Sequence, residues 1–222
     1  MRDALDDQLA GLLTCLLKMG GLAERMIGNA RDALLDRDEG KRATVFAAEE
    51  DMDRLQSCVD HEAVLTIIKQ QPVASDVRLT FALSRAASNL ERVGDCTVNI
   101  CQAVPFIFEQ DVRPPAEMRD LFDLVKQAVT DALEALISRD VALAQRVVAS
   151  DETINERRDG IFRELLRQIM ADPSTASSSM SLVLVSRNLE RIGDHATNIA
   201  EDVIYMVRGD DVRHAGEQND AC

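Results

Sequence analysis

Apolar side chains recur along most of this chain at alternating steps of three and four residues. The first such series consists of Leu5, Leu9, Leu12, Leu16, Met19, Ala23, Met26 and Ala30. A second series near the end consists of Leu182, Val185, Leu189, Ile192, Ala196, Ile199, Val203 and Met206. This spacing places the apolar side chains on one side of an α-helix, as in a helix packed within a bundle. No stretch shows the strict alternation that predicts a β-strand.

Helix-breaking residues divide these series at short intervals. They lie at residues 36–40, 72–76, 111–115, 138–140 and 172–179. Such punctuation predicts six long helices, over residues 3–35, 40–70, 76–109, 115–137, 140–171 and 177–208. Connections this short make neighbouring helices antiparallel. The polar residues 209–222 lie beyond the last apolar series, and we predict a mobile tail there.

The chain contains an internal repeat. The segment NLERVGDCTVNI at residues 89–100 returns as NLERIGDHATNI at residues 188–199, with eight of twelve positions identical. Upstream, the Arg-Asp pair at residues 37–38 returns at residues 139–140. Each repeat then holds three helices. We therefore predict an all-α protein of two tandem three-helix bundles, residues 1–110 and 113–208.

Charge narrows the possible partners. The chain has 39 acidic and 25 basic residues, a net charge of −14. Nucleic acids and anionic membrane surfaces are bound by clustered Lys and Arg, so this balance argues against both. Solubility and cation binding both remain possible reasons for the excess of acid.

The cysteines and the N-terminus favour a cytoplasmic protein. The five cysteines form no CxxC pair and are predicted to be reduced, mostly packed thiols. The first eight residues carry three Asp and no apolar run, unlike a signal peptide. No segment is apolar enough to be predicted to span a bilayer.

Acidic pairs spaced four residues apart occupy matching places in the two repeats. Such pairs share one face of a helix, and an Asn follows one turn later in the third and sixth helices. The candidate metal ligands are Glu49, Asp53, Glu91, Asp95 and Asn99 in the first repeat, and Asp151, Asn155, Glu190, Asp194 and Asn198 in the second.

Each pair begins one residue after a position of the apolar series, so it lies about 100° away from the core side. Carboxylates gathered on such a flank repel one another unless cations neutralise them. Oxygen ligands favour hard cations such as magnesium, manganese or iron over copper. Gly94 and Gly193 remove a side chain near each pair and leave space for a close approach. The alternative is a solvated face whose acids pair with Arg92, Arg191 and neighbouring lysines.

Two of these segments carry a family resemblance. NLERIGDHATNIAE at residues 188–201 resembles the most recognisable stretch of PhoU proteins, and residues 89–100 resemble its copy in the first repeat. The segments at 49–53 and 151–155 are similar to the companion acidic motif of that family. Asn155 departs from that motif, because an Asp usually stands there, and neutral Asn is a weaker ligand.

The resemblance implies a regulator that silences phosphate uptake and the phosphate-starvation response. Its implied partners are the ATPase subunit of a phosphate ABC transporter and a sensor histidine kinase, and a homodimer is expected. Its implied cofactors are clusters of iron, manganese, magnesium or zinc on the acidic motifs. We expect no catalytic residues, because the sequence has no Ser/His/Asp set, phosphate-binding loop or HExxH motif.

Two alternatives remain open. A helical adaptor could carry these acids only for solubility. A ferritin-like di-iron protein would need Glu-x-x-His pairs projecting into the bundle core, and this sequence has no Glu-x-x-His. His195, beside Asp194, could be a ligand, but we expect a partly buried or surface histidine there.

Overall fold

The computed structural model describes residues 2–109 and 112–209, and the predicted tail at 210–222 lies outside them. The described residues form six α-helices, one 3₁₀ turn and no strand. In chain order they are α1 (Arg2–Leu35), α2 (Glu39–Gln70), α3 (Ala74–Phe108), α4 (Glu117–Ser138), α5 (Val141–Ala171), η1 (Pro173–Thr175) and α6 (Ala176–Arg208). The all-α class and the six helices are as predicted, and each helix begins and ends within two residues of its predicted bounds.

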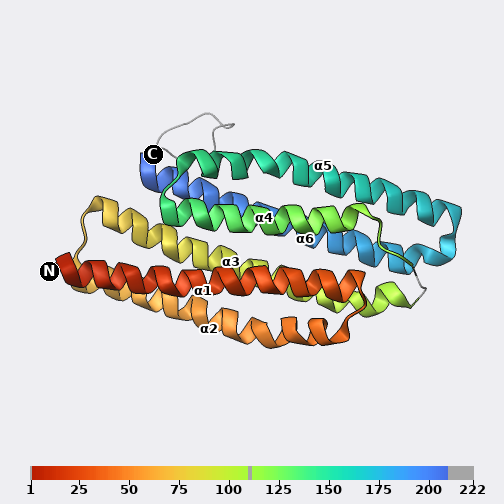
Figure 1. Ribbon diagram of the computed structural model, residues 1–222, viewed down its shortest axis with the longest axis horizontal. Helices are drawn as coiled ribbons and strands as arrows, with labels where there is room; N and C mark the ends of the chain where they lie inside the picture. The colour runs from red at the N-terminus through yellow and green to blue at the C-terminus, as the bar shows by residue number, and fades with distance from the viewer. Residues whose placement is uncertain (1, 110–111, 210–222) are drawn as a thin grey trace.

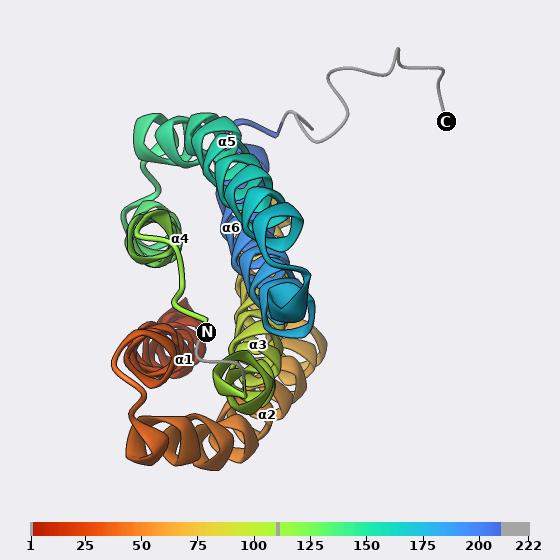
Figure 2. The ribbon, with the colours of Figure 1, turned by 90° about the vertical axis from the view of Figure 1, so that its right-hand side faces the viewer.

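The helices pack as two triplets that follow the repeat. Helices α1, α2 and α3 all contact one another, as do α4, α5 and α6. Figure 1 shows the two triplets stacked side by side, with α2 and α5 at opposite outer edges. The end view in Figure 2 shows α1 beside α4 on one side and α3 beside α6 on the other. The α3–α6 contact is the most extensive between any two helices.

The apolar series form one continuous core. Seven of the eight apolar positions predicted for α1 are buried, and all eight predicted for α6. Large fully buried side chains come from both triplets, among them Leu16, Met52, Leu90 and Phe122. The two bundles therefore share a core across α3 and α6.

The repeated Arg-Asp pair sets the start of the second helix in each triplet. Asp38 caps α2 by accepting from the Lys41 amide at 3.0 Å, and Asp140 caps α5 by accepting from the Ala142 amide at 2.8 Å. The arginines before them, Arg37 and Arg139, both adopt left-handed backbone angles, with φ of 57° and 55°. A side-chain cap satisfies an N–H group that the first helical turn leaves unpaired.

A proline inside α3 is accommodated by a side chain from α2. Pro105 has no N–H, so the carbonyl of Cys101, four residues earlier, loses its usual helical partner. The guanidinium of Arg42 donates a hydrogen bond to that carbonyl at 3.0 Å. This contact replaces the missing helical bond and fastens α2 to α3.

Polar contacts also join the two triplets across the α3–α6 interface. The Arg85 guanidinium forms an ion pair with Asp202, whose side chain is 3% exposed, at 3.0 Å. His195 is buried, at 7% exposed, and its Nδ1 lies 3.2 Å from the Asn89 carboxamide oxygen. His195 is therefore more deeply buried than the sequence indicated.

Candidate functional site

The acidic pairs of the first repeat lie on facing sides of α2 and α3. We call Glu49, Asp53, Glu91 and Asp95 the first carboxylate cluster. Glu49 and Glu91 are half-buried, while Asp53 and Asp95 are exposed. Burial raises the pKa of Glu91, and the nearby charges of Asp95 and Asp53 raise it further. The structure therefore brings carboxylates from two helices within electrostatic reach of one another.

The second carboxylate cluster consists of Asp151, Asn155, Glu190 and Asp194 on α5 and α6. Burial raises the pKa of Asp194, and the charges of Asp151 and Glu190 add to this effect. In each repeat, then, an acid on one helix acts electrostatically on an acid of the companion helix. Asn99 and Asn198 are exposed one turn further along, and the contacts resolved in the described segments do not join them to either cluster.

The clusters differ in their counter-charges. In the second cluster Arg158 of α5 forms an ion pair with Glu190 at 3.3 Å. Asn155 also donates a hydrogen bond to Asp151 at 2.9 Å. In the first cluster the repeat-equivalent positions hold Gln56 and Asp53, and no ion pair within the described residues reaches any of its four carboxylates. Arg158 was not among the predicted site residues, although the sequence shows that the equivalent residue of the first repeat, Gln56, is uncharged.

The arginines of the repeated ERxGD segment lie near the central interface. Arg92 offsets part of the rise in the pKa of Glu91, and Arg158 and Arg191 offset part of the rise in the pKa of Asp194. Burial lowers the pKa of His195 to about 4, and Arg92 and Arg191 lower it further. A solvated face of the kind described above would have ion pairs between these arginines and the cluster carboxylates. Neither Arg92 nor Arg191 forms one among the described residues.

The two glycines face the core rather than the acids. A Cβ on Gly94 would lie 3.4 Å from Met52 Cγ, and one on Gly193 would lie 2.9 Å from Ile154 Cδ1. Met52 and Ile154 directly precede Asp53 and Asn155 and are buried. The space that the sequence analysis assigned to the acidic face is therefore filled by the companion helix. The close approach is between helices, and it holds the acidic pairs next to one another.

The donor set in the first cluster is made of oxygen atoms alone, which suits a hard cation. Across residues 2–109 and 112–209, no three His, Cys, Asp or Glu side chains lie close enough together to form a complete metal site. The chemistry of the first cluster fits a cation, whereas Arg158 and Asn155 make the second cluster a poorer fit. Metal binding remains a prediction for both clusters.

Exposed apolar side chains form a second repeated surface feature. Val64, Ile68 and Phe81 are 55%, 65% and 57% exposed on α2 and α3. The repeat-equivalent residues on α5 and α6 are also exposed: Leu166 at 46%, Met170 at 76% and Met180 at 51%.

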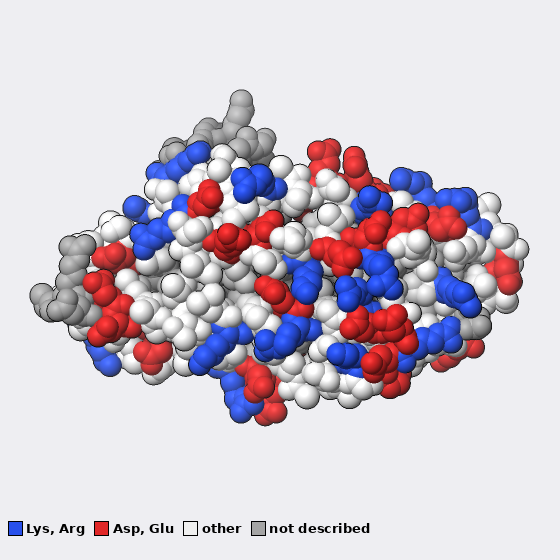
Figure 3. Space-filling view, viewed as in Figure 1, with Lys and Arg blue, Asp and Glu red and all other residues white. Residues whose placement is uncertain are grey.

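The face of the molecule in Figure 3 shows acidic and basic side chains intermixed rather than a field of one sign. None of the described helices is long and apolar enough to cross a membrane.

Comparison with known proteins gives consistent relatives. The profile of the PhoU domain matches the chain twice, at residues 16–104 and 118–203. The phosphate-specific transport system accessory protein PhoU homolog of Pseudomonas putida is 39% identical over 203 residues, 90% of this chain and 79% of that protein. The accessory protein PhoU of Escherichia coli is 31% identical over 210 residues, 94% of this chain and 87% of that protein.

Solved structures have the same fold. The crystal structure of PhoU from Pseudomonas aeruginosa matches with a TM-score of 0.88 and 35% identity, covering 92% of this chain and 99% of that one. The crystal structure of the phosphate transport system regulatory protein PhoU from Streptococcus pneumoniae matches with a TM-score of 0.87. At 22% identity, over 94% of this chain and 99% of that one, it supports the fold alone.

Proposed function

This chain belongs to the PhoU family, and from that premise we propose that it negatively regulates phosphate uptake and phosphate-starvation signalling. The observation that carries the proposal is the likeness to accessory proteins of the phosphate-specific transport system over nine-tenths of the chain. In this proposal the chain acts through contacts with the ATPase subunit of the transporter and with a sensor histidine kinase, not through catalysis. A homodimer and a cytoplasmic location remain predictions.

The repeated apolar surface supports a role in protein contacts. Exposed apolar patches on soluble helices commonly mark interaction sites. The first apolar patch is Val64, Ile68 and Phe81, and the second apolar patch is Leu166, Met170 and Met180. Because the two patches occupy equivalent positions in the repeat, one molecule offers two similar docking surfaces. We assign these surfaces to the transporter's ATPase subunit.

Co-purification tests this assignment. The tagged chain should retain the ATPase subunit, and changing Ile68→Ser together with Phe81→Ser, or Met170→Ser together with Met180→Ser, should reduce the amount retained several-fold. The control is Leu17→Ser, because Leu17 is 50% exposed on α1 outside both patches. If the wild-type chain retains no ATPase subunit, or if both double variants retain as much as the control, the assignment is wrong.

The proposal includes metal ions on the first carboxylate cluster. Asp95 and Asp53 act electrostatically on Glu91, no ion pair among the described residues reaches the cluster, and its side chains supply only oxygen ligands. A bound cation would supply the positive charge that relieves their mutual repulsion. Glu49, Asp53, Glu91 and Asp95 would hold it, joining α2 to α3.

The double variant Glu91→Ala with Asp95→Ala should lower the bound metal measured by elemental analysis. Helical content should barely change, because Asp95 is exposed and Glu91 is only half-buried, and neither belongs to the apolar core. Glu117→Ala with Asp120→Ala is a matched control, since it removes two exposed acids from α4. Unchanged metal content in the Glu91/Asp95 variant would show that the cluster does not bind metal.

A further inference from the structure

Two cysteines lie at the same level on neighbouring helices of the first triplet. Helices α1 and α2 run in opposite directions from the turn that joins them and pack against each other (Figure 1). Cys15 lies 20 residues before Leu35, where α1 ends. Cys58 lies 19 residues after Glu39, where α2 begins. At a rise of about 1.5 Å per residue, both cysteines are therefore about 30 Å from the turn.

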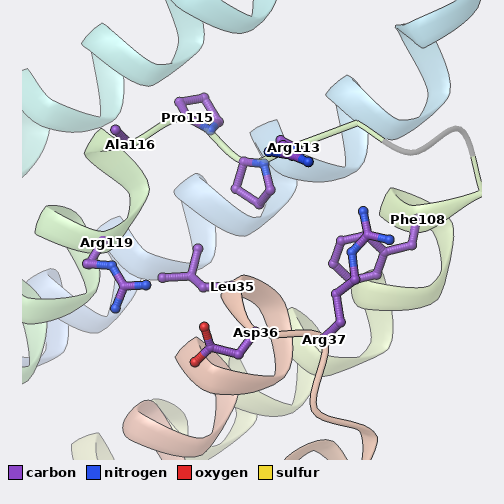
Figure 4. Close-up of a pocket in the computed structure, with 9 residues that line it drawn as sticks. Leu35, Asp36, Arg37, Phe108, Arg113, Pro115, Ala116 and Arg119 are labelled. Carbon is purple, nitrogen blue, oxygen red and sulfur yellow. The ribbon is translucent and has the colours of Figure 1, made fainter.

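Contacts at the turn hold the two helices in this register. Asp38 caps the first turn of α2 by accepting from the Lys41 amide. Beside it, the guanidinium of Arg37 lies 4.3 Å from the centroid of the Phe108 ring at the end of α3. Figure 4 shows Arg37 against this ring, next to Asp36 at the end of α1. The turn is therefore fastened to both α2 and α3, which limits sliding of α1 along α2.

The positions that follow the two cysteines show which side of each helix they occupy. Leu16 on α1 and Val59 on α2 are buried in the core. Each cysteine stands one residue before such a position, so its side chain lies at the edge of the packed side of its helix. Both are free thiols, Cys58 exposed and Cys15 half-buried, so a small solute can reach them.

The two thiols act directly on each other. Burial raises the pKa of the Cys15 thiol, and the Cys58 thiol raises it further, through its charge and through a hydrogen bond between the two side chains. Lys18 on α1 and Glu62 on α2 act on the same pKa in opposite directions and less strongly. The thiols of Cys15 and Cys58 therefore meet at the place that the helix register indicates.

The second repeat shows that these two positions face a common space. At the spacing that separates the two helix-capping aspartates, the equivalents of Cys15 and Cys58 are Glu117 on α4 and Gly160 on α5. Glu117 and Gly160 line one groove. Neither residue can form a disulfide, so a thiol pair at these positions belongs to the first repeat alone.

The other two cysteines in the described segments differ from this pair. Cys96 and Cys101 are 1% and 0% exposed, and burial raises their pKa to about 11 and about 12. They stand five residues apart on α3, which places their side chains about 140° apart around the helix. They can neither meet each other nor meet a solute, so they serve as an internal control.

We propose that Cys15 and Cys58 form a reversible disulfide when the protein is exposed to hydrogen peroxide. The exposed Cys58 thiolate attacks one peroxide oxygen, the O–O bond breaks, and hydroxide leaves and takes up a proton, which makes Cys58 a sulfenic acid. The Cys15 sulfur then attacks the sulfenic sulfur, and the S–O bond breaks. The hydroxyl group leaves with the Cys15 proton as water, so two thiols and one peroxide give one disulfide and two waters.

The disulfide restrains an outer helix. Among the described helices, α2 contacts only α1 and α3. A covalent bond about 30 Å from the turn closes a long loop of the chain, which restricts the unfolded state and stabilises the folded one. Because α2 also carries Val64 and Ile68, oxidation restrains the helix that presents most of the first apolar patch. Reduction by a dithiol releases the helix again.

Mass spectrometry of the full-length protein tests the proposal. The reduced protein is treated with an equimolar amount of hydrogen peroxide, unfolded, alkylated and digested. We expect peptides joined through Cys15 and Cys58, while Cys96 and Cys101 are alkylated, and dithiothreitol should restore both missing thiols. A proposal of this pair would be overturned by a bond to Cys222 or to a second chain, or by oxidation of either thiol without any disulfide.

Thermal unfolding measures the effect of the bond. Peroxide should raise the Tm of the wild-type protein by several degrees, and dithiothreitol should reverse the rise. Cys58→Ser and Cys15→Ser each leave a single thiol of the pair and should show no rise, which also controls for oxidation of the eight methionines. Cys222→Ser should respond as the wild type does. A rise in Cys58→Ser equal to that of the wild type would contradict the pairing.

Discussion

At the scale of single residues, the two repeats act as internal controls for each other. Where the first repeat has Asp53 and Gln56, the second has Asn155 and Arg158. These differences remove one carboxylate and add one positive charge, which pairs with Glu190. The first cluster is therefore the better candidate for a cation. The second cluster should gain affinity for a cation if Asn155 and Arg158 are replaced by the residues of the first repeat.

The double variant Asn155→Asp with Arg158→Gln makes this exchange. It supplies a fourth carboxylate and releases Glu190 from its ion pair, so the protein should bind more metal than the wild type in elemental analysis. The reverse exchange in the first repeat, Asp53→Asn with Gln56→Arg, should lower the amount of bound metal. The absence of a gain in the first variant would mean that these two residues do not limit the second cluster.

His195 predicts a dependence of stability on pH. Burial and two nearby arginines lower its folded pKa to about 4, below the usual 6.5. Between these values the unfolded chain binds a proton that the folded chain does not, so stability falls as the pH drops from 6.5 towards 4. The loss attributable to His195 should be about 2–3 kcal/mol.

His195→Gln keeps a polar side chain beside Asn89 but cannot titrate. Urea unfolding of metal-free protein at several pH values should show a smaller loss of stability in this variant than in the wild type. The carboxylates with raised pKa, Glu91 and Asp194, are present in both proteins and largely cancel in the comparison. Parallel pH profiles for the two proteins would contradict the low pKa of His195.

The acidic positions of the candidate site could be predicted because helical spacing alone places residues on a shared face. The pairing of Arg158 with Glu190 could not, because it joins side chains on different helices and depends on their relative rotation. The depth of His195 was underestimated for the same reason: the α3–α6 interface covers its side chain, and a single helix does not reveal that partner.

At the scale of elements, the glycines of α3 and α6 control how closely the companion helices approach. The two sites differ in the neighbour that an added methyl group would meet. At Gly94 the neighbours are Met52 and Met26, at 3.4 and 3.6 Å, and methionine adapts easily. At Gly193 the neighbour is Ile154, with atoms at 2.9 and 3.2 Å, and its branched side chain is stiff.

Gly94→Ala should therefore be neutral or stabilise the protein by up to about 1 kcal/mol, because alanine favours the helix. Gly193→Ala should destabilise it by about 1–3 kcal/mol, because the methyl group overpacks against Ile154. Denaturant unfolding of metal-free protein measures both changes. Equal effects of the two substitutions would show that the glycines do not differ in packing.

The bounds of the helices could be predicted because the chain marks them with local signals. Asp38 and Asp140 cap the helices that follow, and their preceding arginines adopt the left-handed turn in both repeats. Pro105 lies inside the helix predicted at 76–109, and what the sequence does not reveal is how α3 accommodates it. The helix survives because Arg42, 59 residues away in the sequence, bonds the freed carbonyl. Local sequence does not reveal such a distant partner.

At the scale of the whole molecule, the two triplets share one core and meet most extensively through α3 and α6. Both carboxylate clusters lie near this interface. Asp95 and Glu91 of the first cluster and Asp194 of the second all raise the pKa of the Cys96 thiol, which burial already raises. The apolar patches lie on the outer helices and on the ends of α3 and α6. A partner bound at the patches and a cation bound at the clusters would therefore contact the same helices.

If this chain represses the phosphate-starvation response when phosphate is plentiful, its loss should release that response. The most direct measurement is a starvation-responsive reporter in phosphate-rich medium, after deletion of every copy of the gene for this chain and its paralogues. We expect the reporter to become active and re-expression of the wild-type chain to silence it. A reporter that stays silent after complete deletion would contradict the regulatory role and favour a structural adaptor.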